Sequence, residues 1–115
     1  MIASPETHVP TDCAPGVKLT QSKNLAKHAA EMIKALGHPI RLRIIALLCQ
    51  KRQHVTALAE RLGAKQAIIS QQLRILRIHG LVEVGRESGF AYYRLAEPKL
   101  RELIHCIEGC PTAAA

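Results

Sequence analysis

Apolar residues recur at helical spacing through the first part of the chain, and this pattern predicts two helices there. The first begins near Ser22 and ends at Gly37, since glycine commonly terminates a helix. Pro39 opens the second, which ends around Gln50, and His38 is expected to cap or pack at its start. The positions that carry the pattern are Leu25, Ala29, Met32, Ile33, Leu36, Ile40, Ile44, Ile45, Leu47 and Leu48.

Two further helices follow a polar break. Thr56 is expected to cap a short helix that closes at Gly63, where a turn can require a positive φ. A longer helix covers about residues 65–79, and Gly80 marks its end. The apolar positions of this pair are Leu58, Ala59, Leu62, Ile69, Leu73 and Leu76.

The period of the pattern changes after Gly80. Residues 81–84 and 90–95 are β-prone, so they predict a two-stranded hairpin whose tip is the glycine-bounded segment 85–89. Pro98 opens a last amphipathic helix that ends near Gly109. The order of short helix, turn, longer helix and hairpin is that of a winged helix-turn-helix, so the predicted fold is mainly α with a small β-hairpin.

A length of 115 residues leaves room for one domain. We expect a flexible N-terminal arm over residues 1–20, the folded domain over 21–110 and a short tail over 111–115. The start of the chain has neither the basic nor the apolar region of a signal peptide, and no apolar run is long enough to cross a membrane. The expected location is therefore the cytoplasm, with no membrane partner.

The chain carries 16 Lys and Arg against 9 Asp and Glu, a formal net charge of +7. This excess favours a polyanionic partner, although a basic surface can also serve solubility alone. An enzyme is not expected, because no nucleophile and base form a recognisable motif and no glycine-rich loop could cradle a phosphate.

The outer face of the longer helix in the predicted pair is the candidate DNA-reading surface. Glutamine and serine can hydrogen-bond base edges in the major groove, and Lys65 can contact phosphate. Arginines further along this helix and in the hairpin would contact the DNA backbone or an adjacent minor groove, although each alone could be a solvated surface charge. The candidate residues are Lys65, Gln66, Ala67, Ser70, Gln71, Arg74, Arg77, Arg86 and Arg94.

Four cysteines, Cys13, Cys49, Cys106 and Cys110, are expected to be reduced thiols available for chemistry. Cys106 and Cys110 are four residues apart, a spacing that on a continuous helix puts both sulfurs on one face. Two thiols could form a disulfide or polysulfide bridge, whereas a soft metal needs three or four ligands, which these cysteines or a histidine could supply. Cys49 could equally be a small buried apolar residue.

Three segments of the chain resemble the arsenic-repressor (ArsR/SmtB) family. Residues 35–44, ALGHPIRLRI, resemble its opening motif, residues 70–82 its recognition helix, and residues 92–95, YYRL, its wing strand. The resemblance runs from about residue 24 to 109. It implies a homodimeric repressor that binds double-stranded, near-palindromic operator DNA, with the first and last helices forming the dimer interface.

The same resemblance bears on what the protein senses. The Cys-x-Cys of the arsenite type is absent, since residues 56–60 contain no sulfur. The positions of the zinc ligands in the zinc type correspond here to Glu97, Lys99, Cys110 and Ala113. A charged lysine does not bind zinc, so the ordinary zinc site is in doubt.

In the persulfide-sensing branch, oxidation joins a cysteine of the second helix to one near the end of the last helix. That layout implies Cys49, Cys106 and Cys110 as sensor thiols and a thiol-reactive effector. No cofactor is required, and the alternative is a metal ion bound as effector by ligands from Cys49, Cys106, Cys110 and Cys13. A different class, a small metal or sulfur carrier or an adaptor without DNA binding, stays open as well.

Overall fold

The computed structural model describes residues 16–109, which contain five α-helices and one antiparallel β-hairpin. After a short 3₁₀ turn (Leu19–Gln21), the elements are α1 (Lys23–Leu36), α2 (Pro39–Gln50), α3 (Val55–Leu62), α4 (Gln66–Ile78), β1 (Val82–Glu87), β2 (Phe90–Leu95) and α5 (Leu100–Glu108). The predicted fold class is confirmed. Residues 1–15, most of the predicted arm, and 110–115, including the tail, lie outside the described part of the chain.

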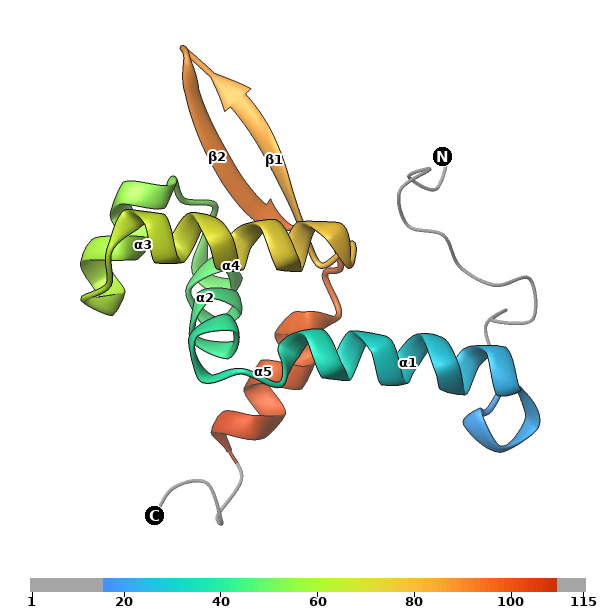
Figure 1. Cartoon of the computed structure of the whole chain (residues 1–115). Coiled ribbons are helices and arrows are strands. Elements are labelled where there is room, and N and C mark those ends of the chain that lie inside the picture. Colours follow the sequence, from blue (N-terminus) through green and yellow to red (C-terminus); the bar gives the residue numbers. More distant parts are fainter. Residues whose placement is uncertain (1–15, 110–115) are drawn as a thin grey trace.

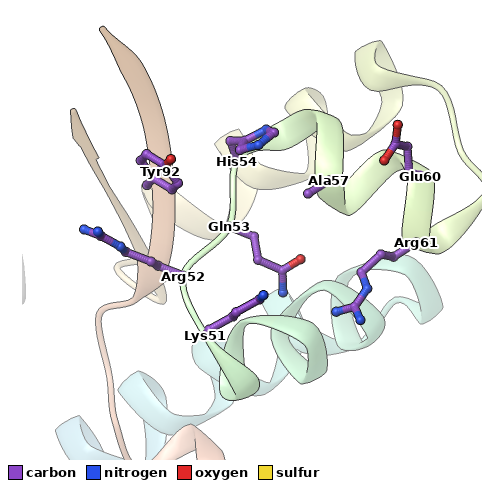
Figure 2. A pocket seen from close by; sticks show the side chains of 8 residues that line it. All are labelled: Lys51, Arg52, Gln53, His54, Ala57, Glu60, Arg61 and Tyr92. Atoms are coloured by element: carbon purple, nitrogen blue, oxygen red, sulfur yellow. The ribbon is translucent and has the colours of Figure 1, made fainter. Parts of the chain in front are cut away.

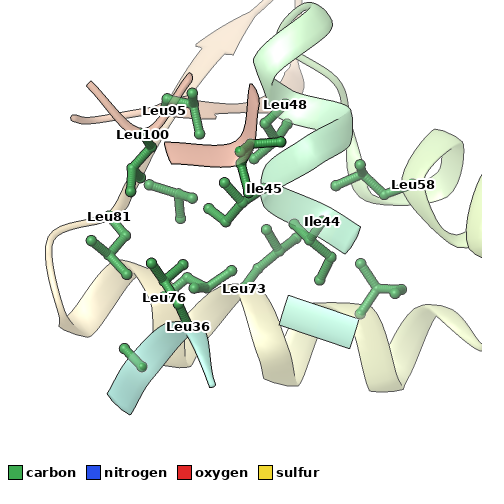
Figure 3. Close-up of a cluster of buried hydrophobic side chains, with 14 of the residues drawn as sticks. Leu36, Ile44, Ile45, Leu48, Leu58, Leu73, Leu76, Leu81, Leu95 and Leu100 are labelled. Carbon is green, nitrogen blue, oxygen red and sulfur yellow. The ribbon is translucent and has the colours of Figure 1, made fainter. Parts of the chain in front are cut away.

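The core forms where α2 is covered by α4, α5 and the base of the hairpin (Figures 1 and 3). Burying a leucine or isoleucine side chain contributes about 1.5–3 kcal/mol, so this aliphatic cluster is the main source of stability. Its members come from every helix and from both strands. They include Leu36, Ile44, Ile45, Leu48, Leu58, Ile69, Leu73, Leu76, Leu81, Val82, Leu95, Leu100 and Ile104.

Local capping explains where the first two helices begin. The Ser22 hydroxyl accepts a hydrogen bond from the Leu25 N–H (2.9 Å) and caps α1. His38 caps α2, because its Nδ1 accepts from the Ile40 N–H (3.3 Å), and Pro39 occupies the first turn. The predicted starts at Ser22 and Pro39 are confirmed.

Gly63 makes the sharp turn between α3 and α4. Its φ of +62° lies in the left-handed region that a residue with a Cβ enters only at a cost. The following N–H, that of Ala64, donates to the Ala59 carbonyl (3.0 Å), which closes the end of α3. This turn sets the angle at which α4 leaves α3, and its predicted position is confirmed.

The predicted cap at Thr56 is wrong, because α3 begins at Val55 with His54 as a cap residue that makes no side-chain capping bond. The reason lies in Gln53, the residue before His54. Gln53 pairs with Tyr93 of β2 through two backbone hydrogen bonds of 3.0 and 2.8 Å. This bridge fixes the chain just ahead of the helix, so α3 starts as soon as the bridge ends.

The hairpin turn is shorter than predicted. The strands run to Glu87 and from Phe90, and only Ser88 and Gly89 connect them, with φ values of +52° and +82°. Two successive residues with positive φ form the turn that matches the natural twist of a hairpin. Arg86 therefore lies within β1, opposite Ala91, rather than at the tip.

The last helix also starts later than predicted. Pro98 and Lys99 form a turn in which the Glu97 carboxylate accepts from the Lys99 N–H (3.1 Å), and α5 begins at Leu100. Its predicted end near Gly109 is confirmed, since Gly109 is the cap residue. Among the described residues, no helix has the length and apolar character to cross a bilayer.

Candidate nucleic-acid interface and cysteine positions

The helix α4 has two distinct faces. Ile69, Leu73 and Leu76 point into the core and are fully buried. The other face is exposed, and no acidic residue occurs from Lys65 to Val82. All seven candidate residues at and along this helix are exposed: Lys65, Gln66, Ala67, Ser70, Gln71, Arg74 and Arg77. The face therefore offers amide, hydroxyl and cationic groups of the kind that contact base edges and phosphates.

The two arginines of the hairpin differ in whether their guanidinium groups form an ion pair. The Nε of Arg94 donates to Glu83 Oε1 (2.7 Å) in a cross-strand ion pair. Gly85 makes room for this pair, since a Cβ there would lie 2.8 Å from Arg94 Nη1. Arg86 is exposed and forms no ion pair with any residue in the described range. Of the two, Arg86 is the one whose guanidinium is not already paired with a carboxylate of the described residues.

A second ion pair ties the hairpin to the loop before α3. The Arg52 guanidinium donates two hydrogen bonds to the Glu87 carboxylate (2.6 and 2.8 Å) and lies over the Tyr92 ring, 4.9 Å from its centre. It holds the pKa of Glu87 below its ordinary value through hydrogen bonding and charge. Sequence reasoning missed this pair, because no local pattern links residues 35 positions apart.

Cys49 lies in the last turn of α2 and is half-buried against the core. Two side chains of α5 act on it. Burial raises the pKa of the Cys49 thiol, the positive charge of Arg101 opposes that rise, and the negative charge of Glu108 adds to it. Arg101 also donates from Nε to the Cys49 carbonyl (3.1 Å), which fixes α5 against the end of α2.

Cys106 is exposed and forms no disulfide with Cys49. It follows Ile104 by two residues, which places it about 200° around α5 from that buried side chain. It is separated by the same rotation from Glu108, whose charge acts on Cys49. Cys49 and Cys106 are both free thiols.

Within residues 16–109, no three His, Cys, Asp or Glu side chains gather as metal ligands, and Cys13 and Cys110 lie outside that range.

The charge environment of Cys49 predicts opposite effects of two substitutions on alkylation. Glu108→Gln removes a negative charge that raises the thiol pKa, so more thiolate exists at pH 7.5 and iodoacetamide reacts faster. Arg101→Gln removes the charge that lowers the pKa, so the reaction slows. In the parent protein, the midpoint of rate against pH should lie above the ordinary thiol value.

These rates are measured by peptide mass spectrometry in a background where Cys13, Cys106 and Cys110 are serine, so that only Cys49 reports. Equal rates in both variants at every pH would show that the two α5 charges do not act on this thiol.

Comparisons with known proteins agree with this geometry. Residues 38–84 match the family model described as bacterial regulatory protein, arsR family. The chain is 32% identical to the biofilm growth-associated repressor of Xylella fastidiosa over 96 residues, 84% of each chain.

Two solved structures are similar to most of the described fold. The crystal structure of the transcriptional repressor BigR from Xylella fastidiosa has a TM-score of 0.72 at 31% identity and covers 82% of this chain and 98% of that one. A homodimeric winged helix-turn-helix DNA-binding domain from Mycobacterium bovis, solved in solution, has a TM-score of 0.68 at 33% identity, covering 79% and 87%. The resemblance noted from the sequence is thereby confirmed, and the chain belongs to the ArsR family of winged helix-turn-helix transcriptional regulators, which are not enzymes.

Proposed function

We propose that this protein is a homodimeric transcriptional repressor that places α4 in the major groove of operator DNA and Arg86 of the wing on the adjacent backbone or minor groove. The observation that carries the proposal is the exposed, acid-free face of α4 opposite its buried leucines and isoleucine. Polar side chains of that face read bases, while Lys65, Arg74 and Arg77 neutralise phosphates.

The dimer is supported by apolar surface on the terminal helices. Figure 1 shows α1 extending beyond the body of the domain, so much of it has few neighbours within one chain. Ile33 of α1 is 63% exposed, and Leu103 and Ile107 of α5 are partly exposed as well. A second copy of the chain would bury these side chains through a two-fold interface. The similar domain from Mycobacterium bovis is homodimeric.

Thiol chemistry is the effector mechanism that we propose. Cys49 is supported as its centre because it borders α5, so a modification of its sulfur would push on a helix of the proposed dimer interface. Its partner in a bridge would be Cys106 or Cys110, from the same chain or from the second copy. The coupling free energy between an effector site and the DNA-binding site is typically about 1–3 kcal/mol.

The test uses reduced, chelator-treated full-length protein. Light scattering should give a molar mass of about twice the 12.6 kDa of one chain, as expected for a dimer. Selection from fragmented genomic DNA should enrich a near-palindromic site whose affinity falls steeply with salt. A monomer that enriches no sequence would overturn the proposal.

The effector is tested separately with a persulfide donor, zinc and arsenite, followed by intact mass and cysteine peptide mapping. A bridge from Cys49 to Cys106 or Cys110 supports the thiol mechanism. Retained metal with protected cysteines and no bridge would instead favour a metal-responsive repressor.

A further inference from the structure

A pocket of about 450 Å³ opens between the loop that follows α2, the length of α3 and the strand β2 (Figure 2). The residues of the loop 51–54 form one side, α3 forms another, and Tyr92 contributes from the strand. The residues that line it include no candidate DNA-reading residue and no cysteine of the described range.

Cationic side chains dominate the lining of this pocket. Among residues 16–109, Lys51 forms no ion pair, and the side chain of Arg61 bonds only the neutral Gln50 Oε1, at 3.4 Å. Figure 2 shows Lys51 and Arg61 on the same side of α3, whereas Glu60, the single acid among the lining residues, points to the other side. Two uncompensated positive charges therefore share one side of the pocket.

The surrounding groups suit an anion as well. His54, the cap residue of α3, offers its first N–H groups no side-chain acceptor, and the positive end of the helix lies at the His54 side of the pocket. Tyr92 of β2 contributes the wall across from α3. The Tyr92 ring is held edge-to-face by His54, with ring centres 5.8 Å apart, and Arg52 lies against it.

We propose that this pocket binds a phosphate-type oxyanion, with Lys51 and Arg61 as its principal ligands. Ammonium and guanidinium groups are the side chains that proteins use for phosphate, and their separate positions can contact different oxygens of one group. The phosphate would come either from the backbone of bound DNA or from a free phosphate-bearing molecule. The first source rests on the proposed DNA-binding function, and the second does not.

The first arm of the test uses no DNA. Inorganic phosphate is titrated into ¹⁵N-labelled protein, with sodium chloride at matched ionic strength as the reference. We expect saturable shifts of the amides at residues 51–57 with phosphate alone. The double variant Lys51→Gln/Arg61→Gln should lose this saturation, while the charge-matched control Lys23→Gln/Lys27→Gln on α1 keeps it.

The second arm measures operator affinity against salt for the same proteins. If the pocket holds a backbone phosphate, the pocket variant should lower the slope of log affinity against log salt by about 0.9 for each phosphate that it no longer neutralises, beyond any change in the α1 control. Saturable phosphate binding with an unchanged slope assigns the pocket to a free anion. Phosphate shifts equal to those of chloride, together with an unchanged slope, overturn the proposal. A parent protein that binds no DNA refutes the proposed function, and the first arm then decides alone.

Discussion

Replacing Gln71 by alanine should weaken binding to the selected operator by about 1–3 kcal/mol while leaving non-specific DNA binding nearly unchanged. Gln71 lies on the exposed face of α4, and its amide can donate to and accept from one base edge. The substitution removes hydrogen bonds that depend on the base, so discrimination between the operator and a scrambled duplex falls. Fluorescence anisotropy with both duplexes measures this difference.

Arg74→Gln on the same helix is the matched comparison. Arg74 is also exposed, but a phosphate contact carries no sequence information. Its removal should weaken binding to the operator and to the scrambled duplex alike, and reduce the slope of log affinity against log salt by about 1. If Gln71→Ala left operator discrimination intact, the assignment of this face to the major groove would fail.

The largest effect on stability is expected from Leu73→Ala. Leu73 lies on α4 two residues after Gln71. Leu73 is fully buried at the centre of the core, where α4 packs on α2. Truncating such a leucine removes apolar burial and leaves a cavity, at a cost of about 2–5 kcal/mol. Urea unfolding followed by circular dichroism measures the change. The proteins must be compared at one concentration, because dimerisation contributes to apparent stability.

Ile78→Ala provides the control within the same helix. Ile78 is 71% exposed, so its truncation should change the free energy of unfolding by no more than about 0.5 kcal/mol. Similar decreases for the two variants would mean that α4 is not oriented in solution as described.

The helices can be predicted because their apolar period directly reflects which side is buried. Gly63 is equally predictable, since a short turn between two helices often needs positive φ and glycine provides it. The hairpin is harder, because Gly85 and Gly89 have the spacing of the two ends of one loop. Gly85 instead makes room for Arg94 within the strand, while Ser88 takes the positive φ that the turn needs.

Contacts between distant segments account for the remaining differences. The start of α3 depends on the bridge from Gln53 to Tyr93, which no local pattern indicates. The cysteines give a similar case. A spacing of four would put Cys106 and Cys110 on one face of a continuous helix, but α5 ends at Glu108 and Cys110 lies outside the described residues. That Cys106 points away from the core is shown by its exposure and by the burial of Ile104.

The segment 49–53 links more of the molecule than its length suggests. Its backbone and side chains bond α5 through Arg101, α3 through Arg61, β1 through Glu87 and β2 through Tyr93. A shift at the end of α2 therefore cannot stay confined to one neighbour. It would move a helix of the proposed dimer interface and the base of the wing together, so this short segment would transmit a change in subunit association to the proposed DNA-binding surface.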